Sequence, residues 1–136
     1  MAATLKLEIV TPEAKVFSED VEMVSLTGID GDMGIYPEHM PLMTQLVAGE
    51  VIARKNASDI SLAVGDGFVQ VTKDRVAILT DMAIKSEDID EAAAELARKK
   101  AEARLAQKLS DEETATVQAS LAHAMAQLKV KQRHKK

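Results

Sequence analysis

The chain has 136 residues, a formal net charge of −5 and no cysteine. This length predicts one domain, or one domain with an appendage. The lack of cysteine excludes disulfides, thiolate catalysis and sulfur-ligated metals. The amino-terminal segment MAATLKLEIV is too short and too charged for a signal peptide, and no apolar run reaches the length of a membrane span. Any association with a membrane is therefore expected to go through another protein.

Acidic and basic residues are unevenly divided along the chain. Residues 1–87 hold 7 Lys and Arg against 14 Asp and Glu, whereas residues 88–136 hold 10 against 8. An acidic body with few aromatic residues argues against nucleic-acid binding, which needs a basic face with stacking rings. The basic end of the chain predicts either a contact with an acidic protein surface or a solvated, frayed terminus. Its five cations are Lys129, Lys131, Arg133, Lys135 and Lys136.

Residues 1–84 carry the pattern of short strands separated by turns. Apolar and polar residues alternate from Leu5 to Ile9, and the run ends at Thr11-Pro12. Strands recurring at intervals of about eight to twelve residues are typical of an antiparallel β-sandwich or small barrel. The other predicted strands are Ala14–Phe17, Val21–Thr27, Gln45–Val47, Gly49–Lys55, Ile60–Val64, Phe68–Thr72 and Arg75–Thr80.

The stretch Gly28–Leu42, GIDGDMGIYPEHMPL, holds three of the six glycines and two of the three prolines. Glycine allows positive φ, whereas proline fixes φ and removes a backbone donor. We therefore expect a shaped, partly buried loop rather than a helix or the middle of a strand. Such a loop would present Asp30, Asp32, Glu38 and His39 at fixed positions. The alternative is a plain connection between strands that carries a few exposed acids.

The composition changes after Ile84. Twelve of the 49 residues from Asp88 onward are alanine, and neither glycine nor proline occurs there. Ser86 and Asp88 are candidate helix caps, and Asp88 has capping-box spacing to Glu91. These features predict a helix over Ile89–Gln107.

A second helix is predicted over Asp111–Lys129, because Ser110 opens another capping box and the chain breaks near Lys108. Two helices joined by two or three residues form an antiparallel hairpin. The predicted fold class is therefore α+β, with an amino-terminal antiparallel β-sandwich over residues 1–86 and a carboxy-terminal two-helix hairpin over residues 87–136.

The hairpin has little apolar surface with which to hold the sandwich. Ile89, Leu96 and alanines form the predicted face of the first helix. Burying alanine stabilises less than burying leucine, since the effect follows apolar area, but alanine has the highest helix propensity. We predict a hairpin able to leave the sandwich without unfolding, the alternative being a hairpin packed there permanently. The predicted stripe of the second helix is Val117, Leu121, Met125 and Leu128.

No catalytic constellation is found. The chain lacks the glycine-rich phosphate loops and the nucleophile elbow of known enzyme families. Its histidines, His39, His123 and His134, are far apart in the sequence, and His123 is expected on a helix surface. The spacing of His39 to its acidic neighbours matches no metal-ligand pattern, so no metal site is predicted.

Several segments in order resemble one known family. They are LKLEIVTPEAKVFSEDVEMV, the loop GDMGIYPEHMPL, the turn GDGFVQV and the run ILTDMAIKSEDID. Together they cover the chain in the sandwich-then-hairpin order of the epsilon subunits of F-type ATP synthases of the bacterial and chloroplast type. The resemblance implies a ten-stranded β-sandwich and a non-catalytic rotor subunit of the central stalk in a proton-translocating ATP synthase.

The resemblance also implies partners. The sandwich would bind the gamma subunit and the ring of c subunits, and the hairpin would switch to an extended form that reaches the catalytic alpha/beta head and inhibits ATP hydrolysis. The chain would lie peripherally on the cytoplasmic face of the bacterial inner membrane, held there only through the complex. The implied c-ring and gamma contacts are Asp32, Tyr36, His39 and Met40. The basic end at Lys129, Lys131, Arg133, Lys135 and Lys136 would meet an acidic stretch of the catalytic beta subunit.

Some bacterial members of that family bind ATP on the folded-down hairpin through the pattern I/L-D-x-x-R-A. Here Ala93 stands where the arginine is expected. Without that cation a principal phosphate partner is missing, so we expect at most weak ATP binding and no required cofactor. The candidate residues for this weak site are Ile89, Asp90 and Ala94, which match the pattern, and Lys100 and Arg104 as partial substitutes.

A second hypothesis is a stand-alone module in which a β-sandwich binds a small ligand or nucleotide against its helices. A tight ligand for the isolated chain, without a co-purifying partner subunit, would favour it.

Overall fold

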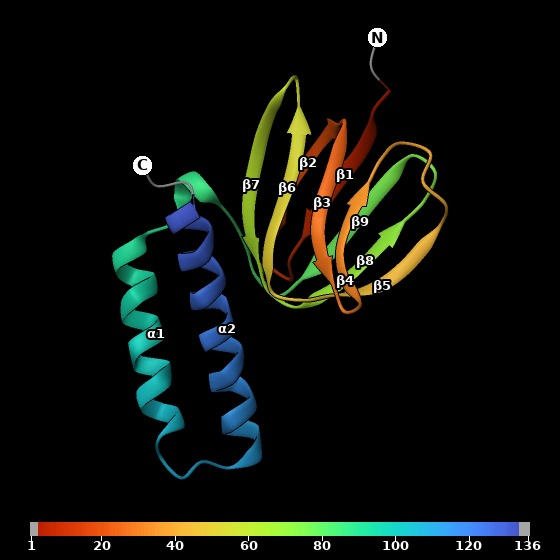
Figure 1. Cartoon of the computed structure of the whole chain (residues 1–136). Helices are drawn as coiled ribbons and strands as arrows, with labels where there is room; N and C mark the ends of the chain where they lie inside the picture. The colour runs from red at the N-terminus through yellow and green to blue at the C-terminus, as the bar shows by residue number, and fades with distance from the viewer. Residues whose placement is uncertain (1–2, 134–136) are drawn as a thin grey trace.

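The computed structural model describes residues 3–133 and shows a β-sandwich with two antiparallel helices at its side (Figure 1). A short 3-10 turn joins the two parts. The strands are β1 (Leu5–Val10), β2 (Lys15–Val21), β3 (Met23–Gly28), β4 (Gly31–Ile35), β5 (Leu42–Leu46), β6 (Gly49–Lys55), β7 (Ser58–Val64), β8 (Gly67–Val71), β9 (Arg75–Thr80) and β10 (Ala83–Lys85). The turn is η1 (Ser86–Asp88), and the helices are α1 (Glu91–Leu105) and α2 (Asp111–Arg133).

One continuous sheet folds over itself to form the sandwich. Its strand order is β10-β7-β6-β3-β5-β8-β9-β1-β2, with β4 paired to β3 beside this path. The pairs are antiparallel, as predicted, except that β1 runs parallel to β9. The prediction of antiparallel pairing is therefore wrong for β1 and β9. Parallel neighbours need a long crossover, and no local pattern reveals which distant strand becomes the neighbour.

The sandwich core is aliphatic. Alternate side chains of the strands point inward, and Leu7, Ile9 and Ile78 have no exposed surface. Phe17 is the one aromatic ring in this cluster, so the core depends on the close packing of branched aliphatic side chains. The strand predictions from alternation are confirmed here, with β9 matching Arg75–Thr80 at both ends.

The glycine- and proline-rich stretch is not one loop, which corrects the sequence prediction. Residues 31–35 form β4, paired along its length with β3, and Leu42 already begins β5. Gly28 and Gly31 face each other across a tight turn, where Gly31 has φ of 124°. Glycine is suited to that backbone conformation, so here it makes a hairpin turn instead of interrupting a strand. Only residues 36–41 remain as a loop.

The segment between sandwich and hairpin also differs from the prediction. Residues 83–85 form the strand β10 on the edge of β7, for which no strand was predicted. Neither Ser86 nor Asp88 caps α1. Asp90 does so, because its Oδ1 accepts from the backbone N–H of Ala93 at 3.0 Å. Ile89 stays extended before the helix and buries its side chain.

The capping box of α2 is confirmed. The backbone N–H of Glu113 donates to Ser110 Oγ at 3.2 Å, and the backbone N–H of Ser110 donates to Glu113 Oε1 at 3.4 Å. The helix begins at Asp111 as predicted and continues past Lys129 to Arg133.

Candidate functional site

The apolar seam between hairpin and sandwich is small and is made by α2. Ala126 and Val130 pack against Ala63 of β7 and against Ile89, with Met82 and Ile84 half-buried beside them. The predicted face of the first helix is wrong at Leu96, which is 69% exposed. The reason is the order of packing: α2 lies between α1 and the sheet (Figure 1).

The buried stripe of α2 also differs from the prediction at one position. Met125 is 53% exposed, and Ala124 is buried in its place beside Leu128. The helix has two partners, so its buried residues occupy two stripes. Ala124 and Leu128 continue the stripe of Val117, which lines the cleft against α1, whereas Ala126 and Val130 face the sandwich.

Ion pairs and hydrogen bonds supplement the seam at the end of α2. Arg133 Nη1 lies 2.5 Å from Oε1 of Glu50 on β6, and Ser61 of β7 donates to the other carboxylate oxygen. Lys131 Nζ donates to the carbonyl oxygen of Ser86 in η1 at 3.3 Å. Of the predicted basic end, Arg133 therefore contacts the sandwich and Lys131 contacts the connecting turn.

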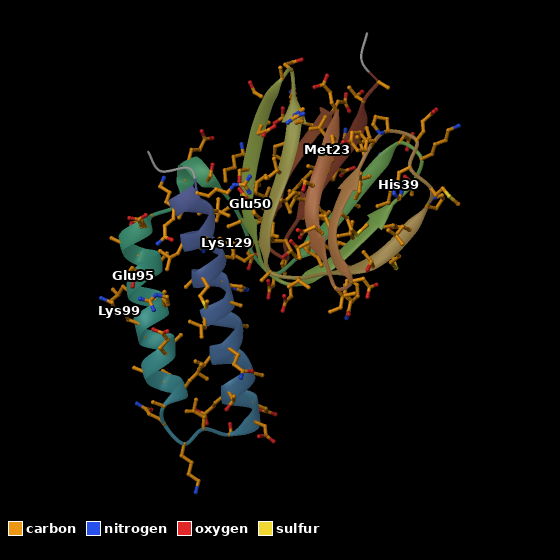
Figure 2. The ribbon with its side chains drawn as sticks, in the orientation of Figure 1. Met23, His39, Glu50, Glu95, Lys99 and Lys129 are labelled. Carbon is orange, nitrogen blue, oxygen red and sulfur yellow. The ribbon has the colours of Figure 1, made fainter. Side chains whose placement is uncertain are left out.

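Lys129 stands one turn earlier on α2 and is exposed (Figure 2). Lys135 and Lys136 lie outside the described residues. The predicted contact of these cations with a catalytic head stays a prediction.

A polar pair lies further back along α2. His123 Nε2 lies 3.0 Å from Oδ1 of Asp81, in the segment between β9 and β10. Both side chains rest over Gly65, where an added methyl group would lie 2.0 Å from the carboxylate and 2.8 Å from the ring. His123 was expected to be a plain helix-surface residue. It does lie on the helix surface, half-buried, and it also contacts the sandwich, because the chain at Gly65 and Asp81 lies under α2.

The outer face of β5, β8 and β9 exposes several large apolar side chains. Phe68 and Leu79 lie side by side across the strands and are 51% and 49% exposed. Ile29 lines the same shallow hollow as Phe68. None of these residues is among the predicted site residues. The sequence pattern could have revealed them. Successive side chains of a strand point to opposite faces, so where Ile78 points into the core, the apolar Leu79 beside it must point outward. Met43 is a further exposed member of the face.

The predicted c-ring and gamma contacts fall at two separate places. Asp32 lies near the β3–β4 turn, where Thr27 Oγ1 donates to its Oδ1 at 3.0 Å. Tyr36, His39 and Met40 belong to the loop beyond the other end of β4, roughly 13 Å or more away along the strand. His39 lies on the side of the sandwich away from the hairpin (Figure 2).

The loop at 36–41 has a defined shape. Glu38 has φ of 65° and its backbone N–H donates to the carbonyl of Lys73 at 2.8 Å. His39 Nδ1 lies 2.6 Å from the carbonyl oxygen of Met40. Tyr36 and Met40 are exposed, so the loop offers apolar side chains to solvent on a held backbone.

The candidate ATP residues are not brought together. Ile89 is buried in the seam and Asp90 is used as the helix cap. Lys100 and Arg104 lie ten and fourteen residues further along the helix, roughly 15 and 21 Å from Asp90. They line an open cleft of about 590 Å³ between α1 and α2, where Arg104 pairs with Glu113 at 3.3 Å. Ala94 is buried.

Helix α1 carries an ion-pair network of its own. Arg98 donates to Glu102 at 2.8 Å and also to Glu95. The hydrogen bond from Arg98 is the main reason why the pKa of Glu95 lies below its ordinary value, and the same bond raises the pKa of Arg98. Such pairs one turn apart support the helix independently of the sandwich. Glu95 and Lys99 lie on the helix side away from the sandwich (Figure 2).

Residues 3–133 lack two further kinds of site. The helices of this part of the chain are not long and apolar enough to cross a membrane. Nor does it hold a group of three or more His, Asp or Glu side chains placed to bind a metal ion.

The chain matches two family models and many relatives. The family described as ATP synthase delta/epsilon chain, beta-sandwich domain, matches residues 4–86, and the corresponding long alpha-helix domain matches residues 87–132. An ATP synthase epsilon chain of Dehalococcoides mccartyi is 47% identical over 135 residues, which is 98% of this chain and 96% of the relative. An epsilon chain of Laribacter hongkongensis is 37% identical over 129 residues, covering 93% and 92%.

Solved structures share the fold at lower identity. A chain in a cryo-EM structure of the Euglena gracilis mitochondrial ATP synthase, OSCP/F1/c-ring, has a TM-score of 0.75 and 21% identity, covering 93% of this chain and 80% of that chain. A chain in the Tetrahymena thermophila mitochondrial ATP synthase central stalk/c-ring structure has a TM-score of 0.60 and 12% identity, covering 93% and 96%.

Proposed function

Because the chain belongs to the delta/epsilon chain family of ATP synthases, we propose that it is a non-catalytic subunit of the central stalk that links the gamma subunit to the c-ring. In this proposal it turns with the rotor while proton flow drives ATP synthesis, and its hairpin inhibits ATP hydrolysis. It lies on the cytoplasmic face of a bacterial inner membrane and is held there only through the complex.

The observation that carries the linking role is the exposed apolar face of β5, β8 and β9. Phe68, Leu79 and Met43 lie on it, outside the surface that α2 covers. Contiguous exposed apolar side chains on a small protein mark a surface that a partner covers. We assign this face to the gamma subunit.

The two ends of β4 supply polar contacts in the same proposal. Asp32, held by Thr27, faces the polar loops of the c-ring. The loop with Tyr36, His39 and Met40 adds a second contact from the other end of the strand. A rotor part that transmits torque needs such separated anchor points, because a single contact allows pivoting.

The inhibitory role is supported by the small seam under the hairpin. Ala126 and Val130 provide its buried apolar contacts from α2, and the connection between the helices lies beyond the edge of the sandwich (Figure 1). Moving a two-state element from 1:99 to 99:1 needs about 5.5 kcal/mol of differential binding. A seam made of small side chains keeps this demand within the reach of a protein partner. In the extended form the basic end from Lys129 onward would meet the catalytic head.

ATP has at most a minor place in this function. Asp90 caps its helix, Ala93 replaces the expected arginine, and Lys100 lies roughly 15 Å along the helix from Asp90. We propose that no cofactor is required and that ATP binds weakly. Calorimetric titration of the isolated chain should detect no tight ATP binding. Tight binding without a partner subunit would favour the alternative, a stand-alone nucleotide-binding module.

Co-purification with the gamma subunit tests the linking role. Replacing Leu79 by Asp puts a charge into the proposed gamma surface, so co-purification should be lost. The matched variant Leu96→Asp changes an exposed apolar residue on α1 and should leave it intact. If both variants co-purify with gamma, or if neither does, the assignment of this face to the gamma subunit is contradicted.

ATP hydrolysis by the reconstituted complex tests the inhibitory role. Deleting residues 88–136 should raise hydrolysis while the sandwich still assembles with gamma, because the sandwich core contains no hairpin residue. Unchanged hydrolysis would show that inhibition does not reside in the hairpin.

A further inference from the structure

We propose that the ion pair between Arg133 of α2 and Glu50 of β6 is a latch that sets the balance between docked and released hairpin, and that an acidic partner surface opens it by taking the arginine. The effect on ATP hydrolysis rests on the proposed function, whereas the latch itself is a property of the isolated chain. The basic end thus has two alternative acidic partners, one inside the chain and one outside.

Glu50 lies on the face of the sheet that α2 covers. It stands opposite Ala63 in the β6–β7 register, and Ala63 is fully buried under Ala126 and Val130. The Glu50 side chain is only 7% exposed, whereas that of Arg133 is 58% exposed. One carboxylate oxygen receives Arg133 at 2.5 Å and the other receives the hydroxyl of Ser61.

The helix that buries the carboxylate therefore also brings a cation that pairs with it. A carboxylate removed from water is costly unless it is paired and hydrogen-bonded. When the hairpin leaves, Glu50 regains water and needs no arginine. Arg133 accordingly stabilises the docked form alone, as a latch must.

The unequal exposure of the two partners predicts an asymmetry. Removing Arg133 takes a cation partner from a buried carboxylate, which penalises docking. Removing the charge of Glu50 leaves a largely hydrated arginine, which penalises docking much less. Removing both charges together eliminates the buried charge and should restore docking.

The same arginine cannot pair with Glu50 and with an acidic partner at once. Within the described part of α2, Lys131 is likewise engaged with Ser86, whereas Lys129 is exposed. An acidic protein surface can therefore bind first at Lys129 and then draw Arg133 from Glu50. A partner of this chemistry favours release through competition for one cation.

The experiment uses the full chain, which has no cysteine of its own. Cysteines replacing Ser58 at the start of β7 and Lys108 between the helices carry a donor and an acceptor dye. Single-molecule energy transfer then measures the docked-to-released ratio. Arg133→Gln should lower this ratio about 10- to 100-fold, the range expected for a hydrogen-bonded charge that is partly screened by water.

Three comparison variants decide the result. Lys99→Gln, an equal charge change on the outer side of α1, should leave the ratio unchanged (Figure 2). Glu50→Gln should lower it less than Arg133→Gln does, and the double variant should return it to within about threefold of the parent chain. Two outcomes would overturn the latch. In one, Arg133→Gln and Lys99→Gln give the same docked-to-released ratio. In the other, the double variant is released as fully as Arg133→Gln alone.

Hydrolysis assays on the complex separate the latch from the proposed function. Suppose that Arg133→Gln releases the hairpin of the isolated chain, but the parent, Arg133→Gln and the double variant all inhibit hydrolysis equally. The latch then stands and the inhibitory role of the hairpin is contradicted. If the energy-transfer ratios do not move, the latch falls whatever the hydrolysis assay gives.

Discussion

The sandwich and the hairpin bury apolar surface by different means. The sandwich encloses large aliphatic side chains such as Leu7, Ile9 and Ile78, all with no exposed surface. The hairpin buries mainly alanines, and its larger buried helix residues are Leu128 and Val130. Hydrophobic stabilisation follows the area removed from water, so the sandwich is the stable unit and the hairpin is its weakly held neighbour.

Because of this difference, we expect the sandwich to stay rigid and the hairpin to be the part that can detach. The helices gain stability from alanine propensity and from pairs along the helix, such as Arg98 with Glu102. Their attachment depends on a few side chains and on polar contacts that form only in the docked position. We therefore expect the hairpin to keep its helices when its attachment to the sandwich is lost.

The largest expected effect is on the sandwich. A methyl group added at Gly67 would lie 1.9 Å from the backbone carbonyl oxygen of Leu79, so the strands β8 and β9 must move apart. Gly67→Ala should lower the free energy of unfolding by about 2–4 kcal/mol, as overpacking against backbone does. Denaturant unfolding followed by sheet circular dichroism measures it. A loss confined to the hairpin would contradict the division into two units.

The next effect is on attachment. Val130 is fully buried in the seam, so Val130→Ala should weaken docking by about 1–2 kcal/mol through lost apolar contact. The energy-transfer ratio of the dye-labelled chain should fall while the unfolding midpoint of the sandwich stays unchanged. Leu96→Ala removes more apolar atoms from an exposed position and is the control. Equal effects of the two variants would place the seam elsewhere.

A matched glycine sharpens the comparison. At Gly65 an added methyl group meets the side-chain ends of Asp81 and His123 instead of backbone. Gly65→Ala should therefore displace this pair and weaken docking by roughly 1 kcal/mol, with a much smaller loss of sandwich stability than Gly67→Ala. Hydrogen exchange at the seam measures it. Sandwich destabilisation equal to that of Gly67→Ala would contradict the expectation.

A smaller effect of opposite sign is expected at the β6–β7 turn. Asn56 and Ala57 both have positive φ, at 53° and 64°, which is the two-residue turn that favours Asn-Gly. Ala57→Gly should relieve the strain of a left-handed alanine and stabilise the sandwich by about 0.5 kcal/mol. The unfolding midpoint should rise without any change in hairpin docking.

The smallest effect concerns the hairpin in acid. The pKa of Glu95 is lowered in the folded chain, chiefly by the hydrogen bond from Arg98, from an ordinary value of 4.5. The contribution of ionised Glu95 to the stability of the hairpin is therefore complete above pH 4.5 and is lost as the pH falls through the lowered pKa. Helical circular dichroism of the parent should decline more between about pH 5 and 3 than that of Glu95→Gln. Parallel declines would mean that the pair does not support the helix.

The fold class and much of the secondary structure can be predicted from the sequence, because they depend on residues that are neighbours in the chain. Alternation predicted Arg75–Thr80 as a strand, and the capping box at Ser110 predicted where α2 begins. The stretch 28–42 shows the limit of local rules. Its glycines predict a loop, yet Gly34 lies within β4, where hydrogen bonds to β3 outweigh the low strand propensity of glycine.

The tertiary structure alone decided which side chains meet. Arg133 and Glu50 are 83 residues apart, and His123 and Asp81 are 42 apart, so no spacing rule connects them. It also separates Asp32 from His39, although the sequence predicts both residues in a single loop. Local patterns set which elements form, but the covered face of each element is chosen by packing against distant parts of the chain.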